Sequence, residues 1–350
     1  MVLFPEEEAV RERVVEASVA LAKEISKEGS NPPDGPDTLF HYTDAPGLIG
    51  ILEHSTVWLS RAATLNDPRE LSYGWGVARN FVAERWNDLA PRGATDSPTG
   101  LFYGNLVEVM KSNLRRPDKL GDFARLDPFV ACFCEAPDLL SQWNYYSRDG
   151  GYCIGFERDR LISATLATTP GSPAPPPSDP AEGPLELCPV IYQPDEQRRR
   201  IADAAKRFEE LLVREVSGEK QGHWSAGAGA AAICFAIAIG TLACRMKAEG
   251  FSGEKEWRLI TFPPEGEAVS PTDPKGVDAA SRMKFRQLKG RIIPYFEASY
   301  GRGKAPIVSV RSGPTIDFKV AEDSIERLLK GRGYPWEKIA VLPSAVAIRE

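Results

Sequence analysis

The chain has 350 residues, of which 42% are hydrophobic and 26% are charged, and these values are typical of a folded globular protein. A formal net charge of -6 argues against a broadly basic surface made for the nucleic-acid backbone. The six cysteines include no CxxC pair and there are only three histidines, so the sequence predicts neither a disulfide framework nor a metal site. No secretory signal is visible, and we expect a cytoplasmic protein with reduced thiols.

The N-terminal part of the chain is predicted to hold one long helix, a linker and a strand–helix–strand unit. An apolar stripe at helical spacing predicts a docking helix, and with the Pro- and Gly-rich linker after it this segment covers residues 1–37. Short runs rich in β-branched and aromatic residues then predict strands at 38–42 and 56–60. A short apolar helix is expected over 46–53, between the two strands.

A helix start follows at Asn66-Asp67-Pro68-Arg69-Glu70. Asp67 can cap the helix, Pro68 fits its first position, and Glu70 lies where a capping-box acid reaches back. Further along, the sequence predicts helices over 101–114, 195–216 and 321–330, and strands at 129–134, 152–156, 256–262, 292–296, 307–310 and 339–342. Because these strands and helices do not alternate as regular βαβ units, we predict an α+β fold rather than a doubly wound sheet.

Two interruptions divide the main domain, which we expect to span residues 38–300. The Pro-, Ser- and Ala-rich stretch 169–184 cannot bury much apolar area and is expected to be a loop, and a helical insert over 195–247 follows it. The insert contains the uncharged stretch 225–244, which is about long enough to cross a bilayer. Because it is mostly Ala and Gly, we predict a buried core helix rather than a membrane span. Residues 301–350 are expected to form a small α/β appendage that completes the sheet.

Three short segments carry the side chains with chemical potential. The first is His41-Tyr42-Thr43 at the end of a strand, the second runs from Cys132 to Phe156, and the third is Glu254-Lys255-Glu256-Trp257-Arg258. Each of them alone is typical of a structural role. Histidines at strand ends usually have structural hydrogen-bond partners, and aromatic side chains usually pack in a core. If both are extended, Glu254 and Glu256 point to one face beside Arg258, as on a solvated strand edge. The common phosphate-binding motifs GxGxxG and GxxxxGK[ST] are absent.

Taken in order along the chain, these segments resemble one known family. The motifs H-Y-T, W-L-S, N-D-P-x-E, C-F-x-E, W-x-x-Y, K-x-x-x-F-x-x-E-x-E-W-R and I-P-Y lie between Phe40 and Tyr295. They are similar to those of the bacterial domain-of-unknown-function family 2971, which is grouped with the ADP-ribosyltransferase superfamily. The chain departs from the family pattern at Cys134, where the third residue of C-F-x-E is usually serine.

The resemblance implies an ADP-ribosyltransferase-like split β-sheet with flanking helices, a helical insertion, and NAD bound in the cleft. His41 would hydrogen-bond a ribose hydroxyl, and Glu256 would hold the 2′-hydroxyl of the nicotinamide ribose. Tyr42, Trp58 and Tyr146 are alternative candidates for the aromatic side chain that stacks on the nicotinamide. The other cofactor-binding candidates lie on the same motifs and are Thr43, Ser60, Asn66, Trp143 and Arg258.

The implied chemistry is cleavage of the nicotinamide–ribose bond, with NAD as the substrate. Cleavage leaves positive charge on the ribose, which a carboxylate such as Glu256 stabilises, and the same carboxylate can orient the attacking group. Glu254 would position the acceptor, or would pair with Arg258 and steady the strand. We therefore expect transfer of ADP-ribose to an unknown macromolecular acceptor, with a role as a toxin or defence effector.

Two alternatives to this function stay open. An NAD glycohydrolase would use the same residues with water as the acceptor, and a non-catalytic nucleotide-sensing or interaction module would bind without cleaving. The acceptor of a transferase would be a protein or a nucleic acid. Arg115-Arg116 and Arg198-Arg199-Arg200 offer local positive charge for a nucleic acid, although the longer run is more typical of a solvated helix face.

Overall fold

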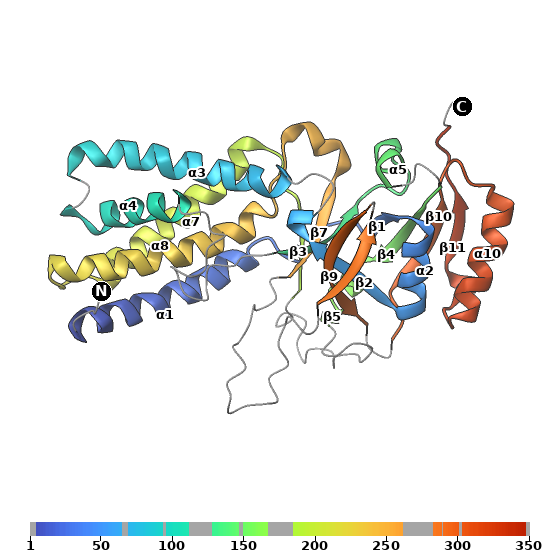
Figure 1. Cartoon of the computed structure of the whole chain (residues 1–350), viewed down its shortest axis with the longest axis horizontal. Coiled ribbons are helices and arrows are strands. Elements are labelled where there is room, and N and C mark those ends of the chain that lie inside the picture. Colours follow the sequence, from blue (N-terminus) through green and yellow to red (C-terminus); the bar gives the residue numbers. More distant parts are fainter. Residues whose placement is uncertain are drawn as a thin grey trace. The chain divides into compact units, whose positions relative to one another are not determined.

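The computed structural model describes residues 5–64, 69–93, 96–111, 128–146, 150–166, 185–261, 283–288, 290–300 and 303–347. It combines helices with a mixed β-sheet, so the predicted α+β class is confirmed (Figure 1). The chain divides into two compact units, each built from three separate stretches of sequence. The helical unit comprises Met1–Glu28, Asp67–Leu126 and Ile191–Gly250, and the sheet unit comprises Gly29–Asn66, Asp127–Val190 and Phe251–Glu350.

The helical unit is built from long helices that lie side by side (Figure 1). They are α1 (Pro5–Lys27), α3 (Arg69–Leu89), α4 (Pro98–Lys111), α7 (Pro194–Glu215) and α8 (Gln221–Ala243). The expected docking helix and the expected insert thus pack in one core with α3 and α4, which the sequence placed in the main domain. The capping residues predicted before α3, Asp67 and Pro68, lie outside the described residues, as does the side chain of Glu70.

Helix α8 is buried on nearly all sides. It is the one described helix that is long and apolar enough to cross a membrane, and 78% of its apolar window is buried within the structure. Phe235 of α8 packs edge-on against Phe102 of α4 and Phe208 of α7. Gly74 lets α3 approach the end of α8, because a Cβ atom there would lie 2.3 Å from the Ala243 carbonyl oxygen. Helix α8 therefore packs as a core helix, as its Ala- and Gly-rich composition predicts.

The sheet unit holds one continuous sheet. Its strands follow the order β11-β10-β4-β1-β3-β2-β9-β5, while β7 joins β3 to β6 and β8 pairs with β9. The strands are β1 (Thr38–Thr43), β2 (Thr56–Arg61), β3 (Phe129–Cys134), β4 (Tyr152–Glu157), β5 (Thr165–Leu166), β6 (Glu186–Pro189), β7 (Glu256–Thr261), β8 (Lys284–Leu288), β9 (Arg291–Ser299), β10 (Ile307–Ser312) and β11 (Ala340–Pro343). β10 and β11 come from the C-terminal segment and extend the sheet beyond β4.

Strand β3 is the point at which the sheet divides. Along its whole length one edge of β3 pairs with β7, so both of its other partners use the opposite edge. β2 pairs there at the start of β3, with Ser60 opposite Val130, and β1 pairs at the end, with Phe40 opposite Cys134. Between these two pairings, β1 and β2 leave β3 and diverge, and α2 (Ala45–His54) connects them.

One face of the sheet carries the main core. Leu48, Ile51 and Leu52 of α2 pack there with alternate residues of the central strands, among them Phe133 and Trp257. Asp44 caps α2 by accepting a hydrogen bond from the Gly47 N–H at 2.8 Å. Helix α10 (Phe318–Gly331) adds Ala321, Ile325 and Leu329 to the same core beside β10 and β11 (Figure 1). The shorter helical elements among the described residues are α5 (Leu140–Tyr146), α6 (Arg158–Leu161), η1 (Ala62–Thr64), η2 (Ala90–Arg92), η7 (Glu249–Glu254) and η8 (Trp336–Lys338).

Most strands lie within two or three residues of their predicted positions, but β5, β6, β8 and α5 were not predicted. β6 and β8 are short and carry Pro or alternating charge, which hides the pattern of a half-buried strand. Helix α5 has seven residues and four aromatic or apolar side chains, too few to show a helical period. Short elements of this kind are determined by their tertiary neighbours rather than by local pattern.

Candidate functional site

His41 lies where β1 leaves β3. Its Nδ1 atom is 2.8 Å from the carbonyl oxygen of Cys132, and because that oxygen can only accept, Nδ1 donates. Burial lowers the pKa of His41, the Cys132 hydrogen bond opposes this, and the charge of Arg286 lowers the pKa further. The imidazole is therefore neutral near pH 7, with its proton on Nδ1, and Nε2 can accept a hydrogen bond.

Trp58 and Ser60 of β2 form a group with two residues that the sequence analysis did not assign to the site. Arg286 of β8 donates from Nη2 to the Ser60 hydroxyl at 3.0 Å, and its guanidinium carbon lies 5.4 Å from the centre of the Trp58 ring. The Tyr295 ring of β9 packs against Trp58, with ring centres 4.8 Å apart. Trp58 is half-buried, so part of this aromatic surface is accessible.

Tyr42 and Trp143 pack against each other on the opposite face of β1 from His41. Their ring centres are 4.7 Å apart in an edge-on arrangement, and both side chains are buried. The Tyr42 hydroxyl donates to the Ala136 carbonyl and accepts from the Leu139 N–H, while Trp143 donates to Asp138. These contacts give both rings a packing role and leave Trp58 as the described aromatic candidate with an accessible surface.

Glu256 and Arg258 form a buried ion pair along β7. Arg258 Nε lies 2.7 Å from Glu256 Oε1, and their side chains are only 4% and 8% exposed, respectively. Glu256 is paired in register with Cys134 of β3. Burial raises the pKa of the Cys134 thiol to about 12, and the charges of Glu256, Glu254 and Glu135 add to the effect. Cys134 is therefore a neutral thiol beside a group of carboxylates, and it is unsuited to act as a nucleophile.

Glu254 does not lie on the strand with Glu256. The two carboxylates were expected to share a face only if both residues were extended, and Glu254 is not. It ends the 3₁₀ helix η7, and the next residue, Lys255, has a φ of 44°. That left-handed residue turns the chain before β7 begins, so strand alternation does not relate Glu254 to Glu256. Arg258 donates from Nε to Glu256, so this carboxylate is one of its partners.

The register of the sheet determines which candidates share a face. Phe40, Cys134 and Glu256 are paired in line, so they point to one face, and His41 points to the other. Ser60 is in line with Val130 and Ile260, which places Ser60 and Trp58 on the face of Glu256. Trp58 precedes Ser60 by two residues and therefore lies at the level of Cys132, whose carbonyl oxygen accepts the hydrogen bond from His41. His41 and Trp58 therefore flank the same point on the edge of β3, from different strands.

Of the three remaining candidates, the structure describes only the side chain of Thr43. Thr43 is half-buried at the end of β1, beside the first turn of α2. Asn66 lies outside the described residues, and so does the side chain of Tyr146. No group of three or more His, Cys, Asp or Glu side chains in the described ranges could hold a metal ion.

Residues 142–259 match the family DUF2971, described as a protein of unknown function. The DUF2971 match runs from α5 to β7 and includes Glu254, Glu256 and Arg258. It does not include β1 and β2, the strands that carry His41 and Trp58. No curated protein and no solved structure matches the chain.

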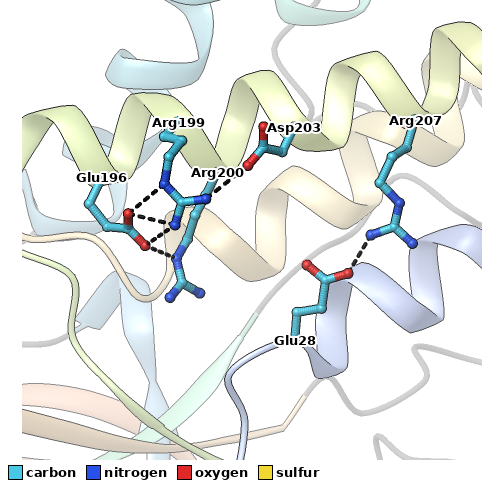
Figure 2. A network of polar contacts seen from close by, with 6 residues as sticks. All are labelled: Glu28, Glu196, Arg199, Arg200, Asp203 and Arg207. Atoms are coloured by element: carbon cyan, nitrogen blue, oxygen red, sulfur yellow. Dashed lines mark hydrogen bonds and ion pairs between the residues drawn. The ribbon is translucent and has the colours of Figure 1, made fainter.

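The DUF2971 match also includes the arginine run of α7, whose charges are paired within the helical unit. Figure 2 shows Arg199 and Arg200 around Glu196, with Arg199 also bonded to Asp203. Arg198 pairs with Glu84 of α3. Acidic partners thus offset much of the positive charge that would attract a nucleic-acid backbone. Arg115 and Arg116 lie outside the described residues.

Sequence reasoning missed Arg286 and gave Tyr295 no role. The I-P-Y motif contains Tyr295, and the alternation of Lys284, Phe285 and Arg286 would have placed both cations on one face of a strand. That signal could be read only with β8 assigned as a strand. Arg286 lies 226 residues after its partner Ser60, so no local pattern connects the two.

Proposed function

We propose that the sheet unit is an ADP-ribosyltransferase-like enzyme that binds NAD where β1 and β2 diverge and transfers ADP-ribose to an unknown macromolecular acceptor. The observation that carries this proposal is the divergence of two strands from one edge of β3, with His41 in the break. The motif resemblance to family 2971, and the grouping of that family with the ADP-ribosyltransferases, support it.

The side chains around the break suit the parts of NAD. Nε2 of neutral His41 accepts the hydrogen bond that a ribose hydroxyl donates. Trp58 offers an aromatic surface to the nicotinamide ring. Because both residues flank the level of Cys132, one ligand can contact them together.

Glu256 is the proposed acid, and its chemistry requires a change in its contacts. Breaking the nicotinamide–ribose bond develops positive charge on the ribose, and a carboxylate stabilises that charge. In the described structure, Glu256 is buried and bonded to Arg258. NAD binding would have to open this ion pair so that the carboxylate reaches the ribose.

The direct test is release of nicotinamide from NAD by the purified full chain. We expect Glu256→Gln to reduce release by roughly 100- to 1000-fold, the size typical of a lost electrostatic contact to the transition state. His41→Ala should weaken NAD binding by roughly tenfold, since it removes one hydrogen bond. Exposed Glu337 in the same unit supplies a matched control, and Glu337→Gln should release nicotinamide at the wild-type rate. Equal rates in Glu256→Gln and Glu337→Gln would refute the catalytic role of Glu256.

A second function is favoured by the faces of the sheet. His41 and Glu256 point to opposite faces, and the Glu256–Arg258 pair is buried, as expected if the carboxylate only stabilises the strand. A nucleotide-sensing module would then bind NAD through His41 and Trp58 without cleaving it. Tight NAD binding that depends on His41, with no nicotinamide release, would support that function and reject the transferase. Release without transfer to any protein or nucleic acid would instead identify a glycohydrolase.

A further inference from the structure

Strands β2, β9 and β8 share a face on which cationic, aromatic and hydroxyl side chains meet. Across β9, register pairs Ser60 of β2 and Lys284 of β8 with the same residue, Tyr295. Directly paired residues point to one face, and Arg286 shares it because it follows Lys284 by two positions. This Arg286 face includes Trp58, Ser60, Lys284, Arg286, Arg291, Tyr295 and Glu297.

Of the three cations on the Arg286 face, Arg291 is exposed at the start of β9, and Lys284 and Arg286 have different partners. Lys284 Nζ lies 2.6 Å from a carboxylate oxygen of Glu297, whose side chain is 10% exposed. Arg286 bonds to the neutral Ser60 hydroxyl and lies over the Trp58 ring. These two contacts orient a planar guanidinium, whose N–H groups match the oxygens of a phosphate better than an ammonium does.

Trp58 provides an independent sign that a ligand binds at this face. Its Nε1 atom is buried and has no hydrogen-bond partner in the part of the chain that the structure describes. This edge of the indole faces α2, because a Cβ atom on Gly50 would lie 3.2 Å from Cζ2. Buried N–H groups are rarely left without an acceptor, so an unpartnered donor marks a place where a ligand oxygen can bind.

The Arg286 face lies at the level of His41 along β3, although His41 points to the other face of the sheet. Arg286 lies over Trp58, and Trp58 is level with Cys132, whose carbonyl oxygen accepts the hydrogen bond from His41. In NAD, each ribose carries the diphosphate on its 5′ carbon. A ligand that binds where β1 and β2 diverge and bonds to His41 through its ribose would therefore bring its diphosphate toward Arg286.

We propose that Arg286, held by Ser60 and Trp58, binds the diphosphate of a nucleotide whose ribose contacts His41. The choice of NAD as that nucleotide rests on the proposed function, but recognition of a diphosphate depends on the Arg286 face alone. The chemical class of ligand is a nucleoside diphosphate or its ribosylated derivative.

Binding of ADP and of NAD to the full chain tests this proposal. Arg286→Gln should weaken ADP binding by roughly 10- to 100-fold, as expected when a hydrogen bond to a charged group is lost, and Arg286→Lys should retain part of the affinity. Pyrophosphate should displace ADP from the wild type, and added salt should weaken ADP binding more in the wild type than in Arg286→Gln. Arg327 is exposed on α10 in the same unit, and Arg327→Gln is the matched control that should bind ADP as the wild type does.

The outcomes separate this inference from the proposed function. ADP binding that depends on Arg286, in a chain that neither binds nor cleaves NAD, would uphold the diphosphate site and reject the NAD function. Nicotinamide release with equal ADP affinity in wild type and Arg286→Gln would uphold the enzyme and overturn the diphosphate site. Absence of ADP binding to the wild type would also overturn it. Thermal unfolding of each variant establishes that a loss of binding is not a loss of fold.

Discussion

The helical unit and the sheet unit distribute their charged side chains differently. In the helical unit most ion pairs lie on helix surfaces, such as the pairs of Arg199 with Glu196 and Asp203 (Figure 2). In the sheet unit several ionisable groups are covered on the faces of the sheet, among them the buried Glu256–Arg258 pair of β7 and the half-buried His41 of β1. Arg245 and Lys247, buried just after α8, are exceptions in the helical unit.

This difference supports the proposal that the sheet unit carries the site. Exposed ion pairs contribute little to stability, so the helical unit depends on its apolar core, where Phe235 packs between Phe102 and Phe208. Burying a charged pair on a sheet costs desolvation free energy, and apolar side chains at the same positions would avoid that cost. Groups kept in such surroundings cluster at functional sites, which supports the proposed ligand site in the sheet unit.

The largest expected effect on stability comes from breaking the buried ion pair. Arg258→Met leaves the Glu256 carboxylate buried without its cation, and we expect the free energy of unfolding to fall by about 3–5 kcal/mol. Chemical denaturation of the full chain measures this. A change below about 1 kcal/mol would mean that the pair is solvated in solution, and the contrast between the two units would then be lost.

A smaller effect is expected where the C-terminal segment is attached to the sheet unit. Asp138 accepts hydrogen bonds from Trp143, Ser344 and the Ala345 N–H at 2.6–2.7 Å. Burial alone would raise the Asp138 pKa, but these hydrogen bonds and the charge of Arg311 lower it. Asp138→Asn removes the charged acceptor and should cost about 1.5–3 kcal/mol of unfolding free energy. Unchanged stability would show that the segment is attached by other contacts.

The pH dependence of stability tests the state of His41. Its folded pKa lies below the ordinary value of 6.5, so the folded protein disfavours the charged imidazole. The contribution of His41 is fully present above pH 6.5 and is lost as the pH falls toward the folded pKa, because the unfolded chain binds the proton first. Unfolding free energies at pH 7.5 and 5.0 should therefore differ less in His41→Gln than in the wild type. An equal difference in both proteins would mean that His41 titrates normally.

The smallest effect is expected on the surface of the helical unit. Arg199→Gln removes exposed ion pairs on α7, and we expect no measurable change in the free energy of unfolding. Nicotinamide release should stay at the wild-type rate, and so should release after replacement of Arg198 or Arg200. A marked loss of release would show that these arginines serve the chemistry, and it would remove the functional contrast between the units.

The sequence predicted long and strongly patterned elements well. Thr38–Thr43, Phe129–Cys134 and Glu256–Thr261 are strands as expected, because alternating β-branched and aromatic residues determine them locally. The apolar helix α8 was also recognised from composition alone. Each of these elements carries its own signal within a few residues.

The arrangement of the candidate site was beyond sequence reasoning. That Glu256 pairs with Arg258, and that His41 points to the other face, depends on the register of β1 and β7 against β3. Arg286 reaches Ser60 through a hairpin that no local pattern predicts. Residue types and motifs therefore named several of the side chains, while tertiary pairing determined which of them face one another.

The most direct test of the account is nicotinamide release from NAD by the wild type, His41→Ala and Glu256→Gln, each measured beside Glu337→Gln. We predict release by the wild type and the control, weaker NAD binding in His41→Ala, and a loss of roughly 100-fold or more in Glu256→Gln. A wild-type chain that neither binds NAD nor releases nicotinamide would contradict the account. The divergence of β1 and β2 would then be a feature of the fold alone.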